Sequence, residues 1–306
     1  MATTTRANID SSGTSLQTWL DRQVLENFEP NLYFYKMGKK PVMPTGYNTL
    51  AFTKPSKLTV SDTTATLTEW VTPTEQAFTY TTINVTPKQY WLYVTISDML
   101  RDASAVNVIG DVAKEVGNNM ARIIDSSIQW VIANGSNVLY AWTATDRASI
   151  WASDKMVWTD LAKISTTLEA RNARKFDWWY VAIMHPNVYH SLKTDWTTGG
   201  FIDSSKYATP ENIFKWEVGM LWGIRIVVSS NVKTFSSTVT VYPTYIIWQD
   251  AYWVAELQSL QTYITGWTAT DSDPIAQRVK VGAKIGFNSI ILQEDALERF
   301  ESASGI

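Results

Sequence analysis

The chain has 306 residues, of which 45% are hydrophobic and 18% are charged, and its formal net charge is −3. This composition is typical of a folded globular protein, and the nearly balanced charge argues against tight nucleic-acid binding through a clustered basic face. The absence of cysteine excludes disulfides, thiolate nucleophiles and cysteine metal sites, and only two histidines remain for any metal or proton-relay role.

The N-terminal segment 1–14 is small and polar, which predicts a flexible arm, and it lacks the apolar core of a signal peptide. The sequence contains no run of about 18 apolar residues, so no membrane span is predicted. We expect a protein that folds in the cytoplasm. From Leu16 to Leu25, apolar residues recur every three to five positions, which predicts a short amphipathic helix that ends before Pro30.

Residues 45–97 are rich in Thr, Val, Ile, Tyr and Phe, with an alternation from Phe78 to Thr86 that predicts strands. Because this stretch holds few large apolar side chains, its strands cannot bury a core alone. We therefore expect a long hairpin that projects from the body and relies on a neighbouring subunit to cover it.

The longest helical pattern spans residues 106–133, where Val, Ile and Met form a stripe at spacings of three and four. Such a helix would approach about 40 Å in length, and Gly135 is its predicted stop. The remaining pattern predicts helices at 159–174 and 210–220, and strands at 180–184, 224–229, 239–247 and from 276 onward. The chain shows no internal repeat, and this order of elements indicates an α+β fold.

Dinucleotide-binding, P-loop, zincin and nucleophile-elbow motifs are all absent from the sequence. His185 and His190 are five residues apart around Pro186, so on a helix they would face different directions. We therefore interpret them as parts of a strand-to-helix turn rather than as joint metal ligands.

Three groups of charged residues could suggest a functional site, and each has a simpler structural interpretation. Turn chemistry is favoured over a metal or catalytic cluster for Asp271 and Asp273 with Asp250. A solvated loop near an interface is favoured over a nucleic-acid contact for the basic group Lys36, Lys39 and Lys40. A solvated acidic face is expected for Glu294, Asp295, Glu298 and Glu301. The sequence thus predicts no catalytic, cofactor-binding or metal site, and a protein that is not an enzyme.

Several short segments stand in a definite order along the chain: Glu29-Pro-Asn-Leu32, Leu67-Thr-Glu-Trp-Val-Thr-Pro73, Tyr93-Val-Thr-Ile-Ser-Asp98, Tyr180-Val-Ala-Ile-Met-His-Pro186, Gly223-Ile-Arg-Ile226 and Asp273-Pro-Ile-Ala-Gln-Arg278 with Val281-Gly282. These segments resemble the major capsid proteins of short-tailed phages. The order of arm, hairpin, long helix, α/β segment and returning strand is also similar to that of coat proteins of the Hong Kong 97 type. The resemblance extends from about residue 16 to residue 293.

This resemblance implies a Hong Kong 97-type capsid fold. Its divisions would be an N-terminal arm with a short helix at 1–41, an extended β-hairpin (the E-loop) at 42–95, a P-domain at 96–157 with its spine helix at 106–134, an α/β A-domain at 158–262, and a P-domain return strand at 263–306. No cofactor is implied.

The resemblance also implies a structural protein of the virion that is assembled in the host bacterial cytoplasm. Subunits would associate into hexamers and pentamers of an icosahedral head around double-stranded DNA, with the hairpin and arm reaching neighbours. A separate scaffolding protein and a portal are expected partners, together with a decoration protein and weak, non-specific contact with DNA, and no membrane. The alternatives are an encapsulin-like cellular nanocompartment, which a cargo-peptide groove would favour, and an α/β enzyme, which a deep pocket with convergent titratable groups would favour.

Tryptophan is unusually abundant, with 15 residues against 14 glycines, whereas average glycine usage of about 7% would give roughly 21 glycines. Several tryptophans stand where the family pattern or turn chemistry calls for glycine: Trp70, Trp91, Trp142, Trp178, Trp248, Trp253 and Trp267. They either fill subunit interfaces or result from a recoded gene, in which UGA codons that mean glycine are written as tryptophan. We expect most of Trp70, Trp142, Trp178 and Trp267 to lie in loops or at element ends.

Overall fold

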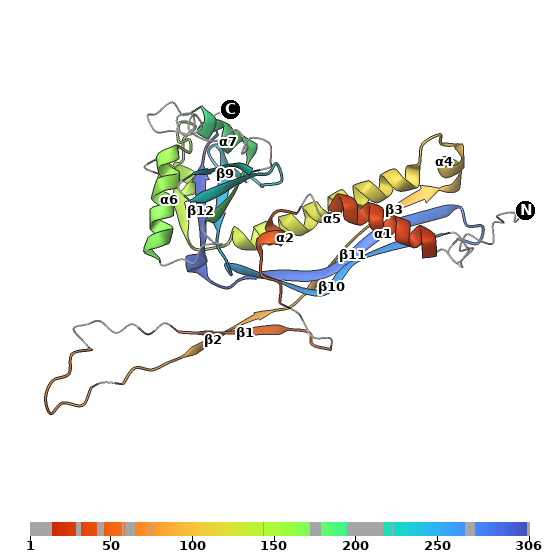
Figure 1. Ribbon diagram of the computed structural model, residues 1–306. Helices are drawn as coiled ribbons and strands as arrows, with labels where there is room; N and C mark the ends of the chain where they lie inside the picture. The colour runs from red at the N-terminus through yellow and green to blue at the C-terminus, as the bar shows by residue number, and fades with distance from the viewer. Residues whose placement is uncertain are drawn as a thin grey trace, which may run out of the picture.

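The computed structural model describes residues 14–28, 32–41, 46–56, 58, 65–73, 75–142, 144–171, 179–194, 217–221, 223–266 and 273–304. Figure 1 shows three parts: an elongated body in which a long helix lies along a sheet, a globular unit at one end of this body, and a hairpin that projects away from both. The α+β class predicted from the sequence is confirmed.

The elongated body is an antiparallel three-stranded sheet in the order β10-β11-β3, with helices α1 and α5 packed on one face. Its elements are α1 (Thr14–Phe28), β3 (Lys88–Ser97), α4 (Asp98–Ala103), α5 (Val108–Ile132), β10 (Tyr252–Thr265) and β11 (Arg278–Ile291). Because β3 pairs with β11 along its whole length, residues 88–97 belong to this sheet, and the projecting hairpin is shorter than the expected 45–97.

Helix α5 forms where the sequence predicts the long helix. Asn107 caps its N-terminus, with the Asn107 Oδ1 accepting from the Gly110 N–H at 3.1 Å. Its apolar stripe is buried against the sheet and α1, from Val116 through Ile132. Gly117 lets α1 approach closely, because a Cβ at this position would lie 2.6 Å from the backbone oxygen of Val24.

The globular unit contains a seven-stranded mixed sheet in the order β4-β12-β9-β5-β7-β6, with β8 paired beside β9. Its elements are β4 (Val138–Tyr140), η3 (Arg147–Ser149), α6 (Trp158–Ala170), β5 (Tyr180–Met184), α7 (Pro186–Lys193), β6 (Glu217–Leu221), β7 (Ile224–Val228), β8 (Phe235–Ser236), β9 (Thr240–Ile247), η5 (Glu294–Ala296) and β12 (Leu297–Ser302). Strand β5 is buried along its whole length, as its continuous apolar run predicts.

One element of this unit differs from the sequence prediction. Residues 217–221 form strand β6, antiparallel to β7, whereas a helix was expected over 210–220; residues 210–216 lie outside the described part of the chain. The helical spacing of apolar residues here is overridden by backbone pairing with β7, because a short apolar run fits a helix or a strand equally well.

The acidic group near the C-terminus is only half solvated. Glu294 and Asp295 are exposed, as expected, but Glu298 and Glu301 on β12 are fully buried, so the prediction of a solvated face is wrong for them. Arg171 binds Glu298 at 2.5 Å, and Arg147 binds Glu301 through two contacts of 2.6 and 2.8 Å. Burial of these carboxylates is tolerated because each is paired with a guanidinium group.

The hairpin consists of β1 (Leu50–Pro55) and β2 (Tyr80–Val85), which pair antiparallel, and it follows the short helix α2 (Phe34–Met37) in the chain. Its base is attached to the body: the Phe52 ring lies 4.5 Å from the Trp253 ring, and the Asn288 side chain donates to the Thr86 carbonyl at 2.7 Å. Beyond this base the described residues between the two strands extend away from the rest of the molecule (Figure 1).

Candidate functional site

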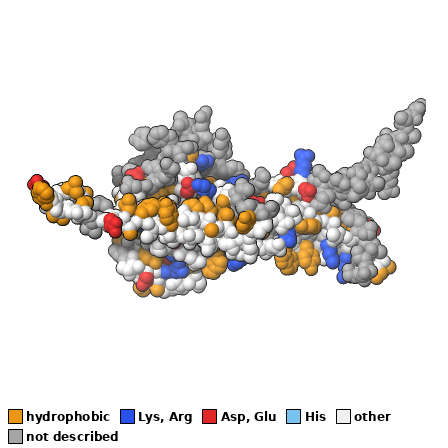
Figure 2. All heavy atoms as spheres, turned by 90° about the horizontal axis from the view of Figure 1, so that it is seen from below, with side chains coloured by type: hydrophobic (Ala, Val, Ile, Leu, Met, Phe, Trp, Pro, Cys, Tyr) orange, Lys and Arg blue, Asp and Glu red, His pale blue; other side chains and the backbone are white. Residues whose placement is uncertain are grey.

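Among the described residues, helices cover only one face of the sheet of the elongated body. Along β3, Leu92 and Ile96 point toward the helices, while Trp91 and Tyr93 point to solvent. Along β11, Lys280 and its neighbours at every second position lie on the same open face. Figure 2, which views the molecule from below, shows apolar side chains gathered along the body. The described part of one chain therefore leaves one side of this sheet without a covering layer.

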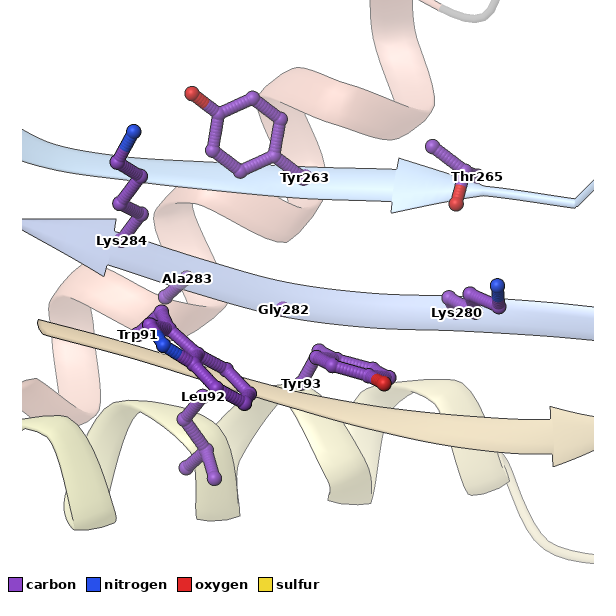
Figure 3. Close-up of a pocket in the computed structure, with 9 residues that line it drawn as sticks. All are labelled: Trp91, Leu92, Tyr93, Tyr263, Thr265, Lys280, Gly282, Ala283 and Lys284. Atoms are coloured by element: carbon purple, nitrogen blue, oxygen red, sulfur yellow. The ribbon is translucent and has the colours of Figure 1, made fainter.

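A groove runs across this open face. Gly282 is paired with Tyr93 on one side and with Tyr263 on the other, so a residue without a side chain lies between two tyrosine rings. The cavity has a volume of about 420 Å³, and Figure 3 shows the side chains around it. A Cβ at Gly282 would lie 2.7 Å from the Tyr93 Cβ, so glycine is needed for the groove to have this depth.

The groove combines apolar walls with positive charge. Trp91 stacks on Tyr93 with ring centroids 5.5 Å apart and an interplanar angle of 24°. Of the described residues that line the groove, Lys280 and Lys284 are the charged ones. They are four positions apart on β11, which separates their Cα atoms by roughly 13 Å at about 3.3 Å per residue. The site therefore suits an extended apolar segment that carries negative charge.

The outer part of the hairpin has the complementary properties. Its described residues, 65–73 and 75–79, are all exposed, including Leu67, Val71 and Phe78. Between residues 65 and 87 the sequence has Glu69 and Glu75 but no lysine or arginine. Apolar side chains so exposed on a segment without a core are unfavourable in a monomer and are typical of a contact surface.

The structure supports the turn interpretation of both histidine and aspartate groups. The His185 ring accepts from the Asn187 N–H at 3.2 Å and caps α7, and burial lowers the pKa of His185. Asp273 accepts from the backbone N–H of Arg278 at 3.0 Å, while Asp250 pairs with Lys39 at 3.2 Å. Asp271 lies outside the described residues, and within the described ranges no three His, Cys, Asp or Glu side chains come together as a metal site.

The basic group at Lys36, Lys39 and Lys40 is largely engaged within the chain. Lys39 pairs with Asp250, and the Lys40 ammonium lies 3.7 Å from the centroid of the Tyr35 ring. Two of the three cations therefore contribute to local structure, which argues against a nucleic-acid site. Lys36 lies in α2 and Lys39 forms an isolated β-bridge with Trp253, so the expected loop is wrong for these two residues.

A buried carboxylate, Asp125, has no counterpart in the sequence-based predictions. It lies on α5 and accepts from the backbone N–H groups of Tyr33 at 2.7 Å and Tyr35 at 3.2 Å, which ties the segment before the hairpin to the long helix. Burial raises the pKa of Asp125 to about 6, although these hydrogen bonds act in the opposite direction. The sequence clue to this buried carboxylate was the presence of an aspartate beside the apolar stripe of α5.

Both described tryptophans of the predicted loop set lie in turns: Trp70 between the hairpin strands and Trp142 after β4. Trp178 and Trp267 lie outside the described residues. The described helices include none that is both long and apolar enough to cross a membrane.

A long helix on a three-stranded sheet, an attached α/β unit and an extended hairpin together define the Hong Kong 97-type capsid fold. Solved structures share it at low sequence identity. They include the capsid of Ralstonia phage GP4 (TM-score 0.67, 15% identity, 88% of each chain covered), the cyanophage Pam1 capsid (TM-score 0.69, 11% identity, 92% of this chain and 93% of that one), and the capsid of cyanophage P-SCSP1u (TM-score 0.64, 15% identity, 90% and 89%).

The family model described as phage capsid protein matches residues 79–289, and the chain belongs to this family. None of the curated proteins matches the sequence. The chain is therefore a structural protein, a major capsid protein of a bacteriophage shell, and the nanocompartment alternative is not favoured.

Proposed function

We propose that this major capsid protein assembles into hexamers and pentamers that close an icosahedral head around double-stranded DNA. The observation that carries the proposal is a pair of surfaces on one chain that a monomer leaves uncovered: the aromatic groove on the sheet and the exposed apolar hairpin. Such a head would be built in the host bacterial cytoplasm and would remain part of the virion.

The two surfaces suit one another, and Figure 1 shows the hairpin extending away from the three-stranded sheet of its own chain. In the proposed assembly the hairpin of one subunit lies on the sheet of the next. Leu67, Val71 and Phe78 would pack on the groove walls. Glu69 and Glu75 would approach the two groove lysines, and this pairing would set the direction in which the hairpin lies.

We assign the arm to residues 1–41, the hairpin to 42–95, the P-domain to 96–157 and 263–306, and the A-domain to 158–262. Strand β3 is shared in this division, because it leaves the hairpin and enters the P-domain sheet. The A-domain corresponds to most of the seven-stranded sheet and would point to the capsomer axis.

A scaffolding protein and a portal, supplied as separate chains, would start and shape assembly, and a decoration protein would bind the finished shell. Contact with DNA would be weak and non-specific, which agrees with the net charge of −3 and with the internal pairing of two of the three clustered lysines.

Negative-stain electron microscopy of the purified protein, alone and with the scaffolding protein of the same phage, tests the proposal. Rings of five or six subunits, or closed shells, are the expected result. Compact monomers under all conditions of salt, concentration and scaffold would overturn it.

A further inference from the structure

Trp70 lies at a turn position that normally takes glycine. The Val71 N–H donates to the Thr68 carbonyl at 3.1 Å, which closes a four-residue turn with Trp70 at its third position. The φ of Trp70 is +69°, while Glu69 before it is not in the left-handed region. A hydrogen-bonded turn with positive φ at the third position alone is of type II, which requires glycine or asparagine there.

Trp142 also lies at a turn position that normally takes glycine, in a second turn. The Ala144 N–H donates to the Ala141 carbonyl at 3.3 Å, so Trp142 is the second residue of this turn, and its φ is +57°. Positive φ at the second position occurs in turns of types I′ and II′, which are dominated by glycine, asparagine and aspartate. The two turns are unrelated in sequence: one lies between the hairpin strands β1 and β2, and the other follows β4.

Neither indole ring is buried in the isolated subunit. Trp70 is 97% exposed and Trp142 is 75% exposed, so the described residues of the same chain leave both rings largely in water, and the Trp70 ring would be covered only by a neighbour in the proposed assembly. The left-handed conformation is unfavourable for a residue with a Cβ because the Cβ approaches the following carbonyl oxygen. At both positions the backbone conformation is therefore unfavourable for tryptophan whatever covers its ring, while glycine adopts it without steric cost.

Of the described residues other than glycine, only two more have φ in this region, and both have a local reason. Asp250 has a short polar side chain of the kind that tolerates the left-handed region, and it pairs with Lys39. Ala276 is small, and its turn is held by Asp273, whose carbonyl accepts from the Ala276 N–H and whose carboxylate accepts from the Gln277 N–H, both at 3.2 Å.

We propose that the polypeptide made in the host carries glycine at positions 70 and 142, because the gene uses UGA as a glycine codon that the written sequence renders as tryptophan. The overall composition agrees, with 15 tryptophans against 14 glycines. The inference rests on the backbone conformations of the two turns and holds whether or not a neighbouring subunit covers the Trp70 ring. It also defines a requirement for the host: the capsid gene is translated correctly only where a tRNA decodes UGA as glycine.

Peptide sequencing by tandem mass spectrometry of native particles, together with the codons of the gene, tests the proposal directly. The expected result is UGA at codons 70 and 142 and glycine at both positions in the protein. A UGG codon, or tryptophan in the particle, at either position overturns the proposal.

A second measurement tests the backbone argument. Trp142→Gly is compared with Trp151→Gly in the purified subunit, since Trp151 is similarly exposed at 68% but its φ is not in the left-handed region. The midpoint temperature of unfolding should rise for Trp142→Gly and should not rise for Trp151→Gly. A fall for Trp142→Gly, or an equal rise in both variants, overturns the backbone argument on which the proposal rests.

Discussion

The carboxylate of Asp125 in the middle of α5 accepts a hydrogen bond from the backbone N–H of Tyr33 at 2.7 Å, 92 positions earlier in the chain. The contact fixes the segment between α1 and the hairpin against the spine of the body. Because the carboxylate is buried, it makes the stability of this attachment depend on pH.

The direction of that dependence follows from the pKa of Asp125, which is raised from an ordinary 3.8 to about 6 by burial, even though Lys36 nearby favours the charged form. A raised pKa means that the folded state binds the proton more tightly. The stability contribution is therefore fully present below pH 3.8 and is lost as pH rises through about 6.

Denaturant unfolding of the unassembled subunit from pH 4 to 8, with Asp125→Asn as reference, measures this effect. The free energy of unfolding of the wild type minus that of Asp125→Asn should fall across this range, by about 3 kcal/mol at most for a shift of about two pKa units. A difference that is constant or rises with pH would contradict the burial of this carboxylate.

The ion pairs made by the buried glutamates of β12 predict that a single substitution will lower the free energy of unfolding strongly. Arg147→Met removes the two-contact partner of the fully buried Glu301 and leaves Arg299, at 2.8 Å, as the remaining cation beside it. We expect a loss of roughly 2–3 kcal/mol in the free energy of unfolding, because a buried charge is left only partly compensated.

The same substitution at Arg22 is the matched control. Arg22 pairs with Glu26 on the exposed face of α1, where an ion pair four residues apart contributes roughly 0.3–0.5 kcal/mol. Equal losses for Arg147→Met and Arg22→Met would show that the buried pair is not formed in solution.

Substitution of Gly117 by alanine has two opposite effects on stability, one from helix propensity and one from packing against α1. In an exposed helix Gly→Ala stabilises by about 1 kcal/mol, but at Gly117 the added Cβ would lie 2.6 Å from the Val24 backbone oxygen. We therefore expect Gly117→Ala to destabilise the subunit by about 1–3 kcal/mol, since α1 must move away from α5. Thermal unfolding gives the sign, and a gain in stability would rule out the close helix crossing.

The proposed contact between hairpin and groove predicts a charge-reversal rescue. Lys280→Glu with Lys284→Glu should abolish assembly under conditions in which the wild type forms shells, because Glu69 and Glu75 would face like charges. Glu69→Lys with Glu75→Lys, added in the same chain, should restore it. Sedimentation velocity and electron microscopy measure the outcome.

Lys163→Glu, on the exposed side of α6, is the control for lysine charge reversal outside the groove and should leave assembly unchanged. Assembly that survives reversal of both groove lysines would reject the groove as the hairpin site while leaving the shell function standing. Loss of assembly without rescue by the hairpin variants would assign the groove to another partner segment.

Local patterns in the sequence were sufficient to predict the elements that have a long and regular hydrophobic periodicity. Helix α5 and strands β11 and β5 each appear where predicted. Burial of one face or of both faces of an element determines which of its consecutive positions are apolar, so the element can be recognised from the local sequence. The threonine-rich strands without a core likewise predicted the projecting hairpin.

The tertiary structure alone decided which distant residues meet. The groove requires Tyr93, Tyr263 and Gly282 to lie in one row across three strands, and strand register is set by pairing rather than by local sequence. Glu298 and Glu301 look solvated in the sequence because a carboxylate is rarely buried. Only the folded chain brings Arg171 and Arg147 beside them, and without those guanidinium groups the desolvation of the two carboxylates would not be tolerated.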